Sequence, residues 1–491
     1  MTQAHDAVTT PPPIIIWFRR DLRLCDNPAL TDAVNSGQPV IPLYILDETD
    51  DLRTPGAASL WWLGKSLAQL AASLERLGSR LILRRGVAAV ELTALVRETQ
   101  AAKVVWNRLY DPGVTDRDAA LKAALKSDGV TVQSFNAALL SEPWTVRNKS
   151  GEPFKVFSPF WRAAQTSLDL SQLHPAPEAL TAPLVWPDSQ LLDTWGLQPT
   201  KPDWTGGFDL WTPGEAGAQE RLTTFLASGL ARYTDGRNIP AAEAVSRLSP
   251  HLHFGEISPR QIWAAVDTAI DARPALGRQA DKFKAELGWR EFSHSLLFHN
   301  PQIETRNFKP AFDAFPWRND PVAFTAWTRG QTGYPMVDAG MRELWTTGFM
   351  HNRVRMLVAS FLVKHLLIDW RQGEAWFWET LLDADRANNA ASWQWVAGSG
   401  ADAAPYFRIF SPMGQGEKFD TDGRYVRRWV PELARLPDAA IHSPWTADPQ
   451  ILRAASVTLG QTYPRPIVDH AFARDRALQA LKHTRPEGAA D

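Results

Sequence analysis

The sequence predicts an α/β domain with a parallel sheet, followed by an all-α domain. Over roughly the first quarter of the chain, short β-rich runs alternate with helical stretches, the pattern of parallel strands joined by crossover helices. Beyond about residue 215 this alternation disappears. Apolar residues then recur with helical spacing through segments such as MRELWTTGFMHNRVRMLVASFLVKHLL.

Five strands are expected in the N-terminal part. They are the runs PIIIWF, PVIPLYIL, RLILRR, KVVWN and VTVQSF, at residues 13–18, 39–46, 80–85, 103–107 and 130–135. Residues 57–78, AASLWWLGKSLAQLAASLERLG, have the spacing of a long helix between the second and third strands. We therefore expect a Rossmann-like domain with a parallel sheet at residues 12–136.

The rest of the chain divides into a connector and a helical region. Residues 137–214 are rich in Pro, Trp and Gly and predict a long, wrapped connector. Residues 215–480 predict the all-α domain. The last residues, HTRPEGAAD, are expected to form a frayed tail.

Composition narrows the class of protein. The 491 residues are 44% hydrophobic and 22% charged, which is typical of a globular protein with large cores. A single cysteine, Cys25, excludes a disulfide framework and suits a reducing compartment. The N-terminus lacks the pattern of a signal peptide, and no run is long enough to span a bilayer. We therefore expect a cytoplasmic monomer with no membrane contact and no metal site.

Charge bears on nucleic-acid binding. With 52 Lys and Arg against 54 Asp and Glu, the net charge is −2, which argues against a protein that coats polyanions indiscriminately. A local basic patch remains compatible with this balance.

Several long segments carry a resemblance to a known family. Common catalytic motifs such as the P-loop, HExxH, CxxC and GxSxG do not occur in a usable context. GYPMVDAGMREL, TGFMHNRVRM, DWRQGEAWFWETLLDADRANNAASWQW and DAAPYFRIFSPMGQGEKFD resemble the flavin-binding half of the photolyase/cryptochrome family. WFRRDLRLCDNPAL resembles that family's N-terminal opening. The resemblance covers nearly the whole chain in the right order and is greatest to bacterial cyclobutane pyrimidine dimer photolyases near the plant cryptochromes.

This resemblance implies that the helical domain holds FAD. Carried over position by position, it places around the cofactor Tyr233, Ser246, Arg247, Leu248, Ser249, Phe283, Glu286, Arg290, Asn352, Arg355, Asp383, Asp385 and Asn389. Hydroxyl and guanidinium donors in the SRLS stretch suit a pyrophosphate, and Asn389 is expected at flavin N5. Taken singly, SRLS could cap a helix, the two aspartates could be solvated loop carboxylates, and Asn389 could end a helix.

The chain contains 22 Trp, which is more than ordinary packing requires. The family carries electrons from the surface to the flavin along three tryptophans, which motif alignment places at Trp393, Trp370 and Trp317. Trp393 should be nearest the flavin and Trp317 nearest the solvent. The alternative for each is packing. Trp376, Trp378 and Trp395 are interpreted as core residues first, with a second electron branch as the alternative.

UV-damaged DNA is the partner that the resemblance implies. A pyrimidine dimer must leave the duplex to reach a buried flavin. The catalytic site is expected to include Asn352. In the same site, Trp289 offers a stacking face, Glu286 offers a carboxyl group for base contacts, and Met356 offers an apolar wall. Four cations match family positions that meet phosphates, although each alone could be a solvated surface group: Arg237, Arg353, Arg408 and Lys418.

The implied activity is that of a deoxyribodipyrimidine photo-lyase, a carbon–carbon lyase. Reduced FAD, excited directly or by an antenna pigment, gives an electron to a flipped-out cyclobutane dimer and recovers it after the ring splits. The alternatives are a cryptochrome-type blue-light photoreceptor and an electron-transfer flavoprotein that does not use light. Two features favour repair. Plant-type sensors tend to have Asp where Asn389 stands, and sensors usually carry a long C-terminal extension, whereas the stretch after RRWVPEL is short.

The antenna and the lesion are two further predictions. VVWNRLYDPGVTDRD resembles plant cryptochromes and their bacterial neighbours, so methenyltetrahydrofolate is expected and 8-hydroxy-deazaflavin is the alternative, with contacts at Asn107, Tyr110 and Glu152. Loop residues of these types are also commonly structural. Photolyases for (6-4) lesions carry two histidines in the stretch that here reads MHNRVRM. Asn352 and Met356 occupy those positions and exchange no proton near neutral pH, and on a helix His351 should point about 100° away from Asn352.

Overall fold

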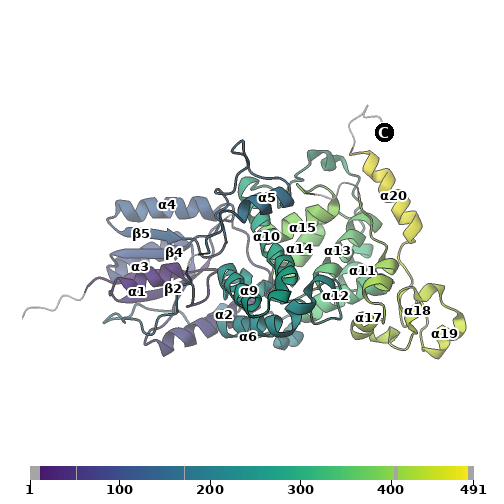
Figure 1. The fold of residues 1–491 in the computed structure, drawn as a ribbon, viewed down its shortest axis with the longest axis horizontal. Coiled ribbons are helices and arrows are strands. Elements are labelled where there is room, and N and C mark those ends of the chain that lie inside the picture. The colour runs from purple at the N-terminus through teal and green to yellow at the C-terminus, as the bar shows by residue number, and fades with distance from the viewer. Residues whose placement is uncertain (1–10, 51, 171, 403–406, 485–491) are drawn as a thin grey trace, which may run out of the picture.

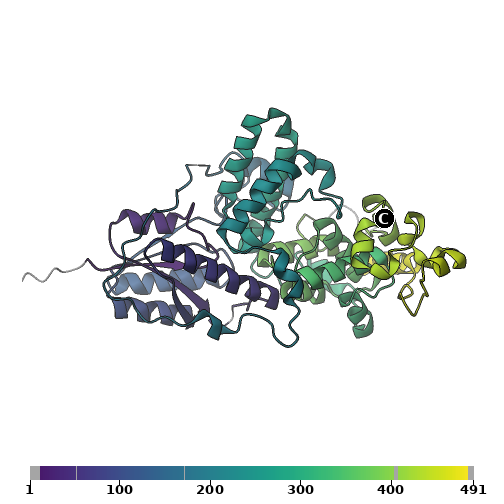
Figure 2. The ribbon, with the colours of Figure 1, turned by 90° about the horizontal axis from the view of Figure 1, so that it is seen from below.

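The computed structural model describes residues 11–50, 52–170, 172–402 and 407–484. The first ten residues, which bear on the expected absence of a signal peptide, and residues 485–491 of the expected tail lie outside the described residues. Figure 1 shows a sheet-containing N-terminal part beside a larger helical part, and Figure 2 shows the same two parts from below.

The N-terminal part contains a parallel five-stranded sheet, so the predicted fold class and all five strands are confirmed. The strands are β1 (Ile14–Phe18), β2 (Val40–Asp47), β3 (Ile82–Gly86), β4 (Lys103–Asn107) and β5 (Thr131–Phe135), in the order β3-β2-β1-β4-β5. In the register, Ile14 of the central β1 lies opposite Val40 and Lys103. The reversal of strand order between β1 and β4 is that of a doubly wound sheet.

Helices cover both faces of this sheet. They are α1 (Pro28–Asn35), α2 (Ala57–Arg76), α3 (Ala88–Thr99) and α4 (Val114–Ser127). Every residue of β1 is buried, and successive side chains point to opposite faces. Ile14 and Ile16 pack in one core with α1 and α2, whereas Ile15 packs in another with α3 and α4. Burial on both faces explains why the strand sequence is a continuous apolar run.

The connector contains α5 (Phe157–Ala164), η1 (Leu192–Trp195) and η2 (Thr205–Leu210). Its first part lies against the helical part, where the Leu140 and Ser141 N–H groups donate to Glu291 Oε2 at 2.9 and 3.1 Å. Its middle follows the sheet domain, because Leu180 N–H donates to Leu77 C=O and Gln190 N–H donates to Leu83 C=O. At its end, the Trp211 indole N–H donates to the Thr347 carbonyl oxygen, 2.9 Å away, in the helical part.

The helical part begins with α6 and ends with α20. Its α-helices are α6 (Glu215–Thr224), α7 (Tyr233–Gly236), α8 (Ser249–His253), α9 (Pro259–Ala272), α10 (Gly277–His299), α11 (Pro321–Thr328), α12 (Pro335–Thr347), α13 (Asn352–Ser360), α14 (Trp370–Thr380), α15 (Arg386–Ala397), α16 (Pro412–Phe419), α17 (Arg424–Trp429), α18 (Asp438–Ile441), α19 (Pro449–Ala454) and α20 (His470–Lys482).

Short 3-10 and π turns connect these helices. They are η3 (Phe225–Gly229), η4 (Leu230–Arg232), η5 (Pro274–Leu276), η6 (Pro310–Ala314), η7 (Phe361–His365), η8 (Pro431–Leu433) and η9 (Pro444–Thr446). Within the described residues of this part, the β-structure is limited to one isolated bridge between Leu459 and Tyr463. The helical interpretation of this region is therefore confirmed.

A buried arginine joins the two parts. Arg23 is 1% exposed, and its guanidinium donates to the carbonyl oxygens of Gly255 and Ala137, each 2.9 Å away, and of Asp26 at 2.7 Å. A guanidinium has five donors, and their satisfaction by carbonyl groups from several segments fixes the relative position of those segments.

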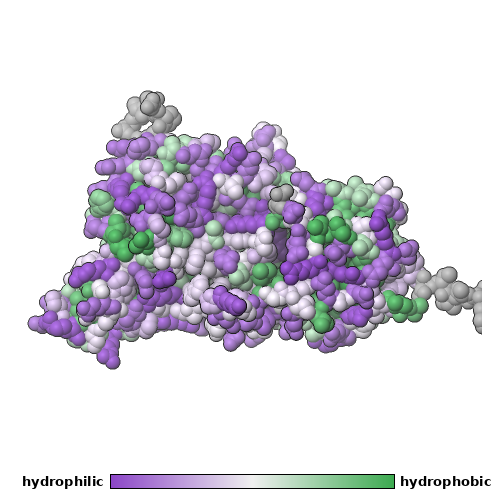
Figure 3. Space-filling view, turned by 180° about the vertical axis from the view of Figure 1, so that it is seen from behind, coloured by the Kyte–Doolittle hydropathy of each residue, from purple (hydrophilic) through white to green (hydrophobic). Residues whose placement is uncertain are grey.

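The face of the molecule seen in Figure 3 is mainly hydrophilic. The face in Figure 3 carries scattered apolar residues and a hollow bordered by hydrophilic ones. Among the described residues, no helix combines the length and apolar character needed to cross a membrane.

Candidate functional site

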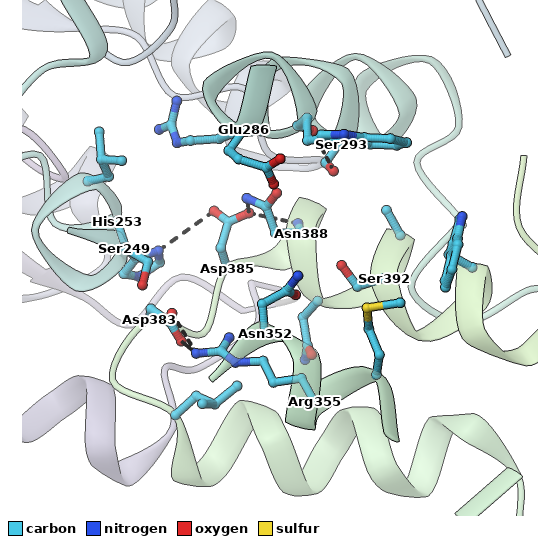
Figure 4. A pocket seen from close by; sticks show the side chains of 18 of the residues that line it. Ser249, His253, Glu286, Ser293, Asn352, Arg355, Asp383, Asp385, Asn388 and Ser392 are labelled. Carbon is cyan, nitrogen blue, oxygen red and sulfur yellow. Dashed lines mark hydrogen bonds and ion pairs between the residues drawn. The ribbon is translucent and has the colours of Figure 1, made fainter. Parts of the chain in front are cut away.

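A cavity of about 550 Å³ lies in the helical part, among α8, α10, α13 and α15 (Figure 4). Its wall includes every residue that the sequence places around a cofactor, from Tyr233 and the SRLS stretch to Asn389, together with Trp289, Met356 and Trp393. These residues are far apart in the chain, and the fold brings them to one space. Trp370 and Trp317 lie outside this lining.

The SRLS stretch forms one wall, and its side chains do not cap helix α8. Arg247 has φ of +54°, which is uncommon for a residue with a Cβ and marks a constrained backbone. The N-cap of α8 is Leu248, and no side chain caps this helix. The Ser246 and Ser249 hydroxyls therefore line the cavity as hydrogen-bonding groups.

Arg355 and Asp383 form an ion pair on another wall. Arg355 Nη2 lies 3.1 and 2.9 Å from the two Asp383 oxygens, and its Nε donates to the Met350 carbonyl oxygen at 2.7 Å (Figure 4). This fixed pair offers a donor and an acceptor side by side. Asp383 is thus a paired carboxylate and not a solvated loop group.

Asp385 is the N-cap of α15 and accepts from the Asn388 backbone N–H at 2.8 Å. Its carboxylate lies 3.6 Å from His253, 3.7 Å from His294 and 3.9 Å from Arg20 (Figure 4). Burial alone would raise the pKa of Asp385, but His294, His253 and Arg20 outweigh it and hold that pKa well below its ordinary value. Burial lowers the pKa of His294 to about 3 and also lowers the pKa of His253.

Asn389 is 8% exposed and donates outward from the cavity. Its Nδ2 donates to the Glu374 backbone oxygen at 3.0 Å and to Glu374 Oε1 at 2.7 Å. No sequence pattern assigns a role to Glu374, which lies in the segment GEAWFWET. It contacts Asn389 because α14 packs on α15. Asn389 lies inside α15, so it does not end a helix.

The mouth of the cavity combines charge and aromatic surface. Glu286 pairs with Arg237, so its carboxylate is engaged by a cation in this state. Trp289 stacks on Phe157 with ring centroids 3.7 Å apart and planes 9° apart. Phe157 comes from α5 of the connector and has no signal in the sequence analysis. Trp395 is half-buried and lines the cavity, so its interpretation as a core residue first is incomplete.

The predicted phosphate-contacting cations lie near this mouth. Arg353 donates to Asn238 Oδ1 at 2.5 Å, and its guanidinium lies 4.6 Å from the Phe419 ring centroid. Burial, Arg237 and Arg408 together lower the pKa of Arg353, so these three guanidiniums are close enough to repel one another. Lys418 lies over the same Phe419 ring at 5.3 Å. The fold thus creates a local cationic cluster on a chain of net charge −2.

His351 differs from its expected position. It is the N-cap of α13 and not a helical residue, and its Nδ1 accepts from the Arg353 backbone N–H at 3.2 Å. Its ring lines the same cavity as Asn352 and Met356. Burial, followed by Arg247 and the neighbouring arginines, lowers the pKa of His351 to about 3. It is therefore neutral at pH 7 and acts as a hydrogen-bond acceptor.

The three tryptophans predicted for electron transfer differ in exposure. Trp393 is 2% exposed, and its ring lies against Gly373 of α14, where an added Cβ would come within 2.1 Å of it. Trp370, one turn before Gly373, is fully buried and donates from its indole N–H to Asn307 Oδ1 at 2.9 Å. Trp317 is half-buried. Trp393 therefore lies on the cavity wall, Trp370 is enclosed, and Trp317 is the member of this set that reaches solvent.

Other tryptophans form a separate stack. Trp376 stacks on Trp345 at 5.9 Å, and Trp345 stacks on Trp204 at 4.8 Å between centroids. Trp345 is 40% exposed. Trp378 lies apart from this stack, with its indole N–H on the Thr54 carbonyl oxygen at 2.8 Å.

The three candidate antenna contacts lie in the N-terminal half in unlike surroundings. Asn107 is 2% exposed, and its Nδ2 donates to Asp21 and Asn27 within the domain. Tyr110 is buried, 5.8 Å from the ring of Trp144, which is 40% exposed. Glu152 is exposed. The geometry of Asn107 is that of a structural residue.

Comparisons with known proteins agree with this geometry. A family model described as the FAD binding domain of DNA photolyase matches residues 283–483, and one described as DNA photolyase matches residues 14–181. A deoxyribodipyrimidine photo-lyase of Agrobacterium fabrum is 55% identical, over 95% of this chain and 97% of its own. Cryptochrome-1 of Arabidopsis thaliana is 42% identical, over 95% of this chain and 70% of its own.

Solved structures give the same result. A bacterial class III photolyase from Agrobacterium tumefaciens is 53% identical with a TM-score of 0.95, over 98% of this chain and 99% of that one. A cryptochrome from Synechocystis is 30% identical with a TM-score of 0.87, over 96% and 99%. Since relatives of this similarity match almost the whole chain, and the residues implied by their motifs surround one cavity, the protein belongs to the photolyase/cryptochrome family.

Proposed function

We propose that this protein is a deoxyribodipyrimidine photo-lyase that repairs cyclobutane pyrimidine dimers in UV-damaged DNA with light. The observation that carries this proposal is the single cavity of about 550 Å³, whose wall is polar enough for a dinucleotide and whose mouth carries two indoles beside a cationic cluster. A cavity of this size with a few convergent polar groups is typical of a cofactor site.

The residues present fit FAD. Ser246, Arg247 and Ser249 supply the hydroxyl and guanidinium donors that a pyrophosphate requires. Asp385, whose pKa is lowered, and Asp383, which is paired with Arg355, offer oxygen acceptors for sugar or ring N–H groups. Tyr233 and Phe283 form a buried aromatic wall, 5.3 Å between centroids. The Trp393 indole N–H is buried without a hydrogen-bond partner among the described residues, as expected for a group facing a ligand space. When bound and reduced, FAD supplies one electron to the dimer under light and recovers it after the ring splits.

The dimer is held at the mouth of the same cavity. Trp289 has one ring face covered by Phe157, which fixes its orientation. Together with Trp395 it offers aromatic surface for the flipped-out pyrimidine dimer, and Met356 offers an adaptable apolar contact. Glu286 is positioned for base contacts once Arg237 turns to a phosphate. This exchange of partners links DNA binding to the release of the carboxylate.

Arg237, Arg353, Arg408 and Lys418 bind the phosphates on both sides of the flipped dimer. Burial, followed by the charges of Arg237 and Arg408, lowers the pKa of Arg353, and an anionic ligand would offset the repulsion between Arg353 and these two neighbours. We further propose that the protein acts as a cytoplasmic monomer.

Trp393, Trp370 and Trp317 carry electrons inward and keep the cofactor reduced. The order is supported by their burial, because a relay needs a sheltered inner member and an outer member that meets solvent. The antenna pigment is proposed to be methenyltetrahydrofolate. An absorption spectrum of protein purified from its own host distinguishes it from 8-hydroxy-deazaflavin.

The decisive experiment is repair of a single defined lesion. Purified, pre-reduced protein is mixed with an oligonucleotide that contains one cyclobutane thymine dimer, and restored thymines are counted after blue light and after darkness. Repair is expected only in light. Trp289→Ala should weaken binding of the damaged strand by about 1–3 kcal/mol, the usual value of base stacking on an aromatic ring. Trp345→Ala, which removes a partly exposed indole outside the cavity, should leave binding unchanged.

A blue-light sensor of the cryptochrome type would give another outcome. Such a protein would bind FAD and photoreduce it but leave the dimer intact, and that result would overturn the repair proposal. Asn389 supports repair, because a neutral amide next to the reduced cofactor adds no negative charge there.

A further inference from the structure

We propose that Arg53 of the N-terminal part is a positioning residue for the flavin. It fixes the Glu374 carboxylate in place, and Glu374 in turn directs the oxygen of the Asn389 amide into the cavity. This inference rests on the proposed function, since it takes the cavity to be the FAD site. It assigns to the N-terminal half a direct part in keeping the cofactor reduced.

Arg53 and Glu374 form a bidentate pair. Arg53 Nη1 lies 2.7 Å from Glu374 Oε1, and Nη2 lies 2.8 Å from Oε2. The Glu374 side chain is only 5% exposed. Two parallel, charge-assisted hydrogen bonds in a sheltered place fix both the position and the orientation of this carboxylate.

Arg53 is itself fixed from two further sides. Its guanidinium lies 3.9 Å from the Trp378 ring centroid, and Nη1 lies 3.2 Å from Glu304 Oε1. The segment that carries it is pressed against α14, because an added Cβ on Gly56 would come within 2.1 Å of the Trp378 carbonyl oxygen. The guanidinium is therefore held in place before any cofactor arrives.

The Glu374 carboxylate determines which end of the Asn389 amide, nitrogen or oxygen, faces the cavity. Amide nitrogen and oxygen are told apart by their partners. Asn389 Nδ2 faces two acceptors, the Glu374 backbone oxygen and Oε1, so Oδ1 lies on the side away from Glu374. Asn389 lines the cavity, and Glu374 lies behind it. The cavity thus meets a carbonyl-type acceptor and not an NH₂ group.

An acceptor at this place favours the reduced flavin, which carries a proton on N5. If Arg53 is removed, the Glu374 carboxylate loses both hydrogen bonds that fix it, so Oε1 is no longer held against Asn389 Nδ2 and the amide can reverse. The backbone oxygen of Glu374 remains as an acceptor, so the reversal is partial. Loss of one oriented hydrogen bond corresponds to a roughly three- to tenfold effect on the reduced state.

The test measures reoxidation of chemically reduced FAD in air, a property separate from repair. Arg53→Met should raise the reoxidation rate roughly three- to tenfold, and Arg53→Lys should lie between it and the parent protein. Glu374→Gln should also speed reoxidation, because its amide can donate to Asn389 Oδ1. This second variant keeps Arg53 and its contacts with Glu304 and Trp378, so it tests the inference even where Arg53→Met does not fold. Arg386→Met is the matched control: Arg386 also pairs with Glu304 but makes no contact with Glu374.

A double mutant separates positioning from general loosening. In an Asn389→Ala background, Arg53→Met should cause no further acceleration, because the amide that it orients is absent. Equal acceleration in both backgrounds, or Arg53→Met behaving like Arg386→Met, would overturn the inference. Protein that retains no FAD would instead contradict the proposed function, so the two failures are distinguishable.

Discussion

At the residue scale, the neighbours of Asn389 determine which end of its amide faces the cavity, and helical spacing separates Trp395 from Trp393. Asn389 has two acceptors of Glu374 at its back, which turn its other end to the cavity. Trp395 lies two residues after Trp393, and a helix of 3.6 residues per turn directs the two indoles to different sides. Trp393 is 2% exposed, whereas Trp395 is half-buried on the cavity wall.

Trp370→Phe is expected to block photoreduction of oxidised FAD. Phenylalanine keeps most of the packing, but its ring is far harder to oxidise, so the relay is interrupted between Trp393 and Trp317. Flavin absorbance under light with an external reductant measures this step. Repair by chemically pre-reduced enzyme should be nearly unchanged. A parallel loss of repair would show a structural role instead.

Asn389→Asp is expected to shorten the lifetime of reduced FAD in air by at least about tenfold, equivalent to roughly 1.4 kcal/mol. The new carboxylate would lie beside an anionic flavin and 2.7 Å from the Glu374 carboxylate, so repulsion comes from both sides. Reoxidation followed at the flavin absorption band measures the effect. A longer-lived reduced flavin would remove Asn389 from the N5 position.

At the element scale, α20 is attached to the core by a pair of histidines. His365, the last residue of η7, is buried, and its Nε2 lies 2.8 Å from Nδ1 of His470, the first residue of α20. Arg476 of α20 donates to the His365 carbonyl oxygen at 2.5 Å. Burial, then His470, Lys364 and Arg476, lower the pKa of His365 to about 3. No carboxylate is among the groups that shift the pKa of His365.

Acid is expected to loosen α20. The unfolded histidine takes up a proton below about pH 6.5, whereas folded His365 resists it down to about 3, so stability is lost as pH falls through this window. Between pH 7 and pH 5 the loss at His365 is about 2 kcal/mol. Hydrogen exchange of residues 470–482, corrected for intrinsic rates, should rise relative to α15. His365→Phe should abolish this acid sensitivity, and equal sensitivity in both proteins would contradict the account.

At the scale of the whole molecule, the cofactor cavity depends on all three regions. The helical part supplies its wall, Phe157 of the connector orients Trp289, and Arg20 of the N-terminal part lies 3.9 Å from Asp385. The two halves therefore act as one catalytic unit.

Repair is expected for cyclobutane dimers and not for (6-4) lesions. Reversal of a (6-4) lesion needs proton transfer, whereas splitting of a cyclobutane ring needs only an electron. Asn352 and Met356 transfer no proton, and the pKa of His351 of about 3 leaves its ring unprotonated at pH 7. Matched oligonucleotides that differ only in the lesion measure the ratio of yields. Comparable (6-4) repair with an untouched cyclobutane substrate would contradict this view of the pocket.

The sequence by itself determined the strands, the helical half and those residues of the cavity wall that match the family's motifs. Strands such as PIIIWF follow from local apolar runs, which need no distant partner to be recognised. The wall residues, from Tyr233 to Asn389, follow from long motifs in a fixed order. These features are either local in the chain or carried by the similarity of whole segments.

Only the tertiary structure decided who contacts whom across those segments. Arg53 and Glu374 are 321 positions apart, and Phe157 meets Trp289 through the packing of α5 on α10. No periodicity or motif encodes such pairs, because they arise when separate hydrophobic faces bury each other and bring polar groups together as a consequence. The same reason explains the capping role of His351 and the cation cluster at Arg353: burial and neighbouring charges, which set their pKa values, exist only in the folded chain.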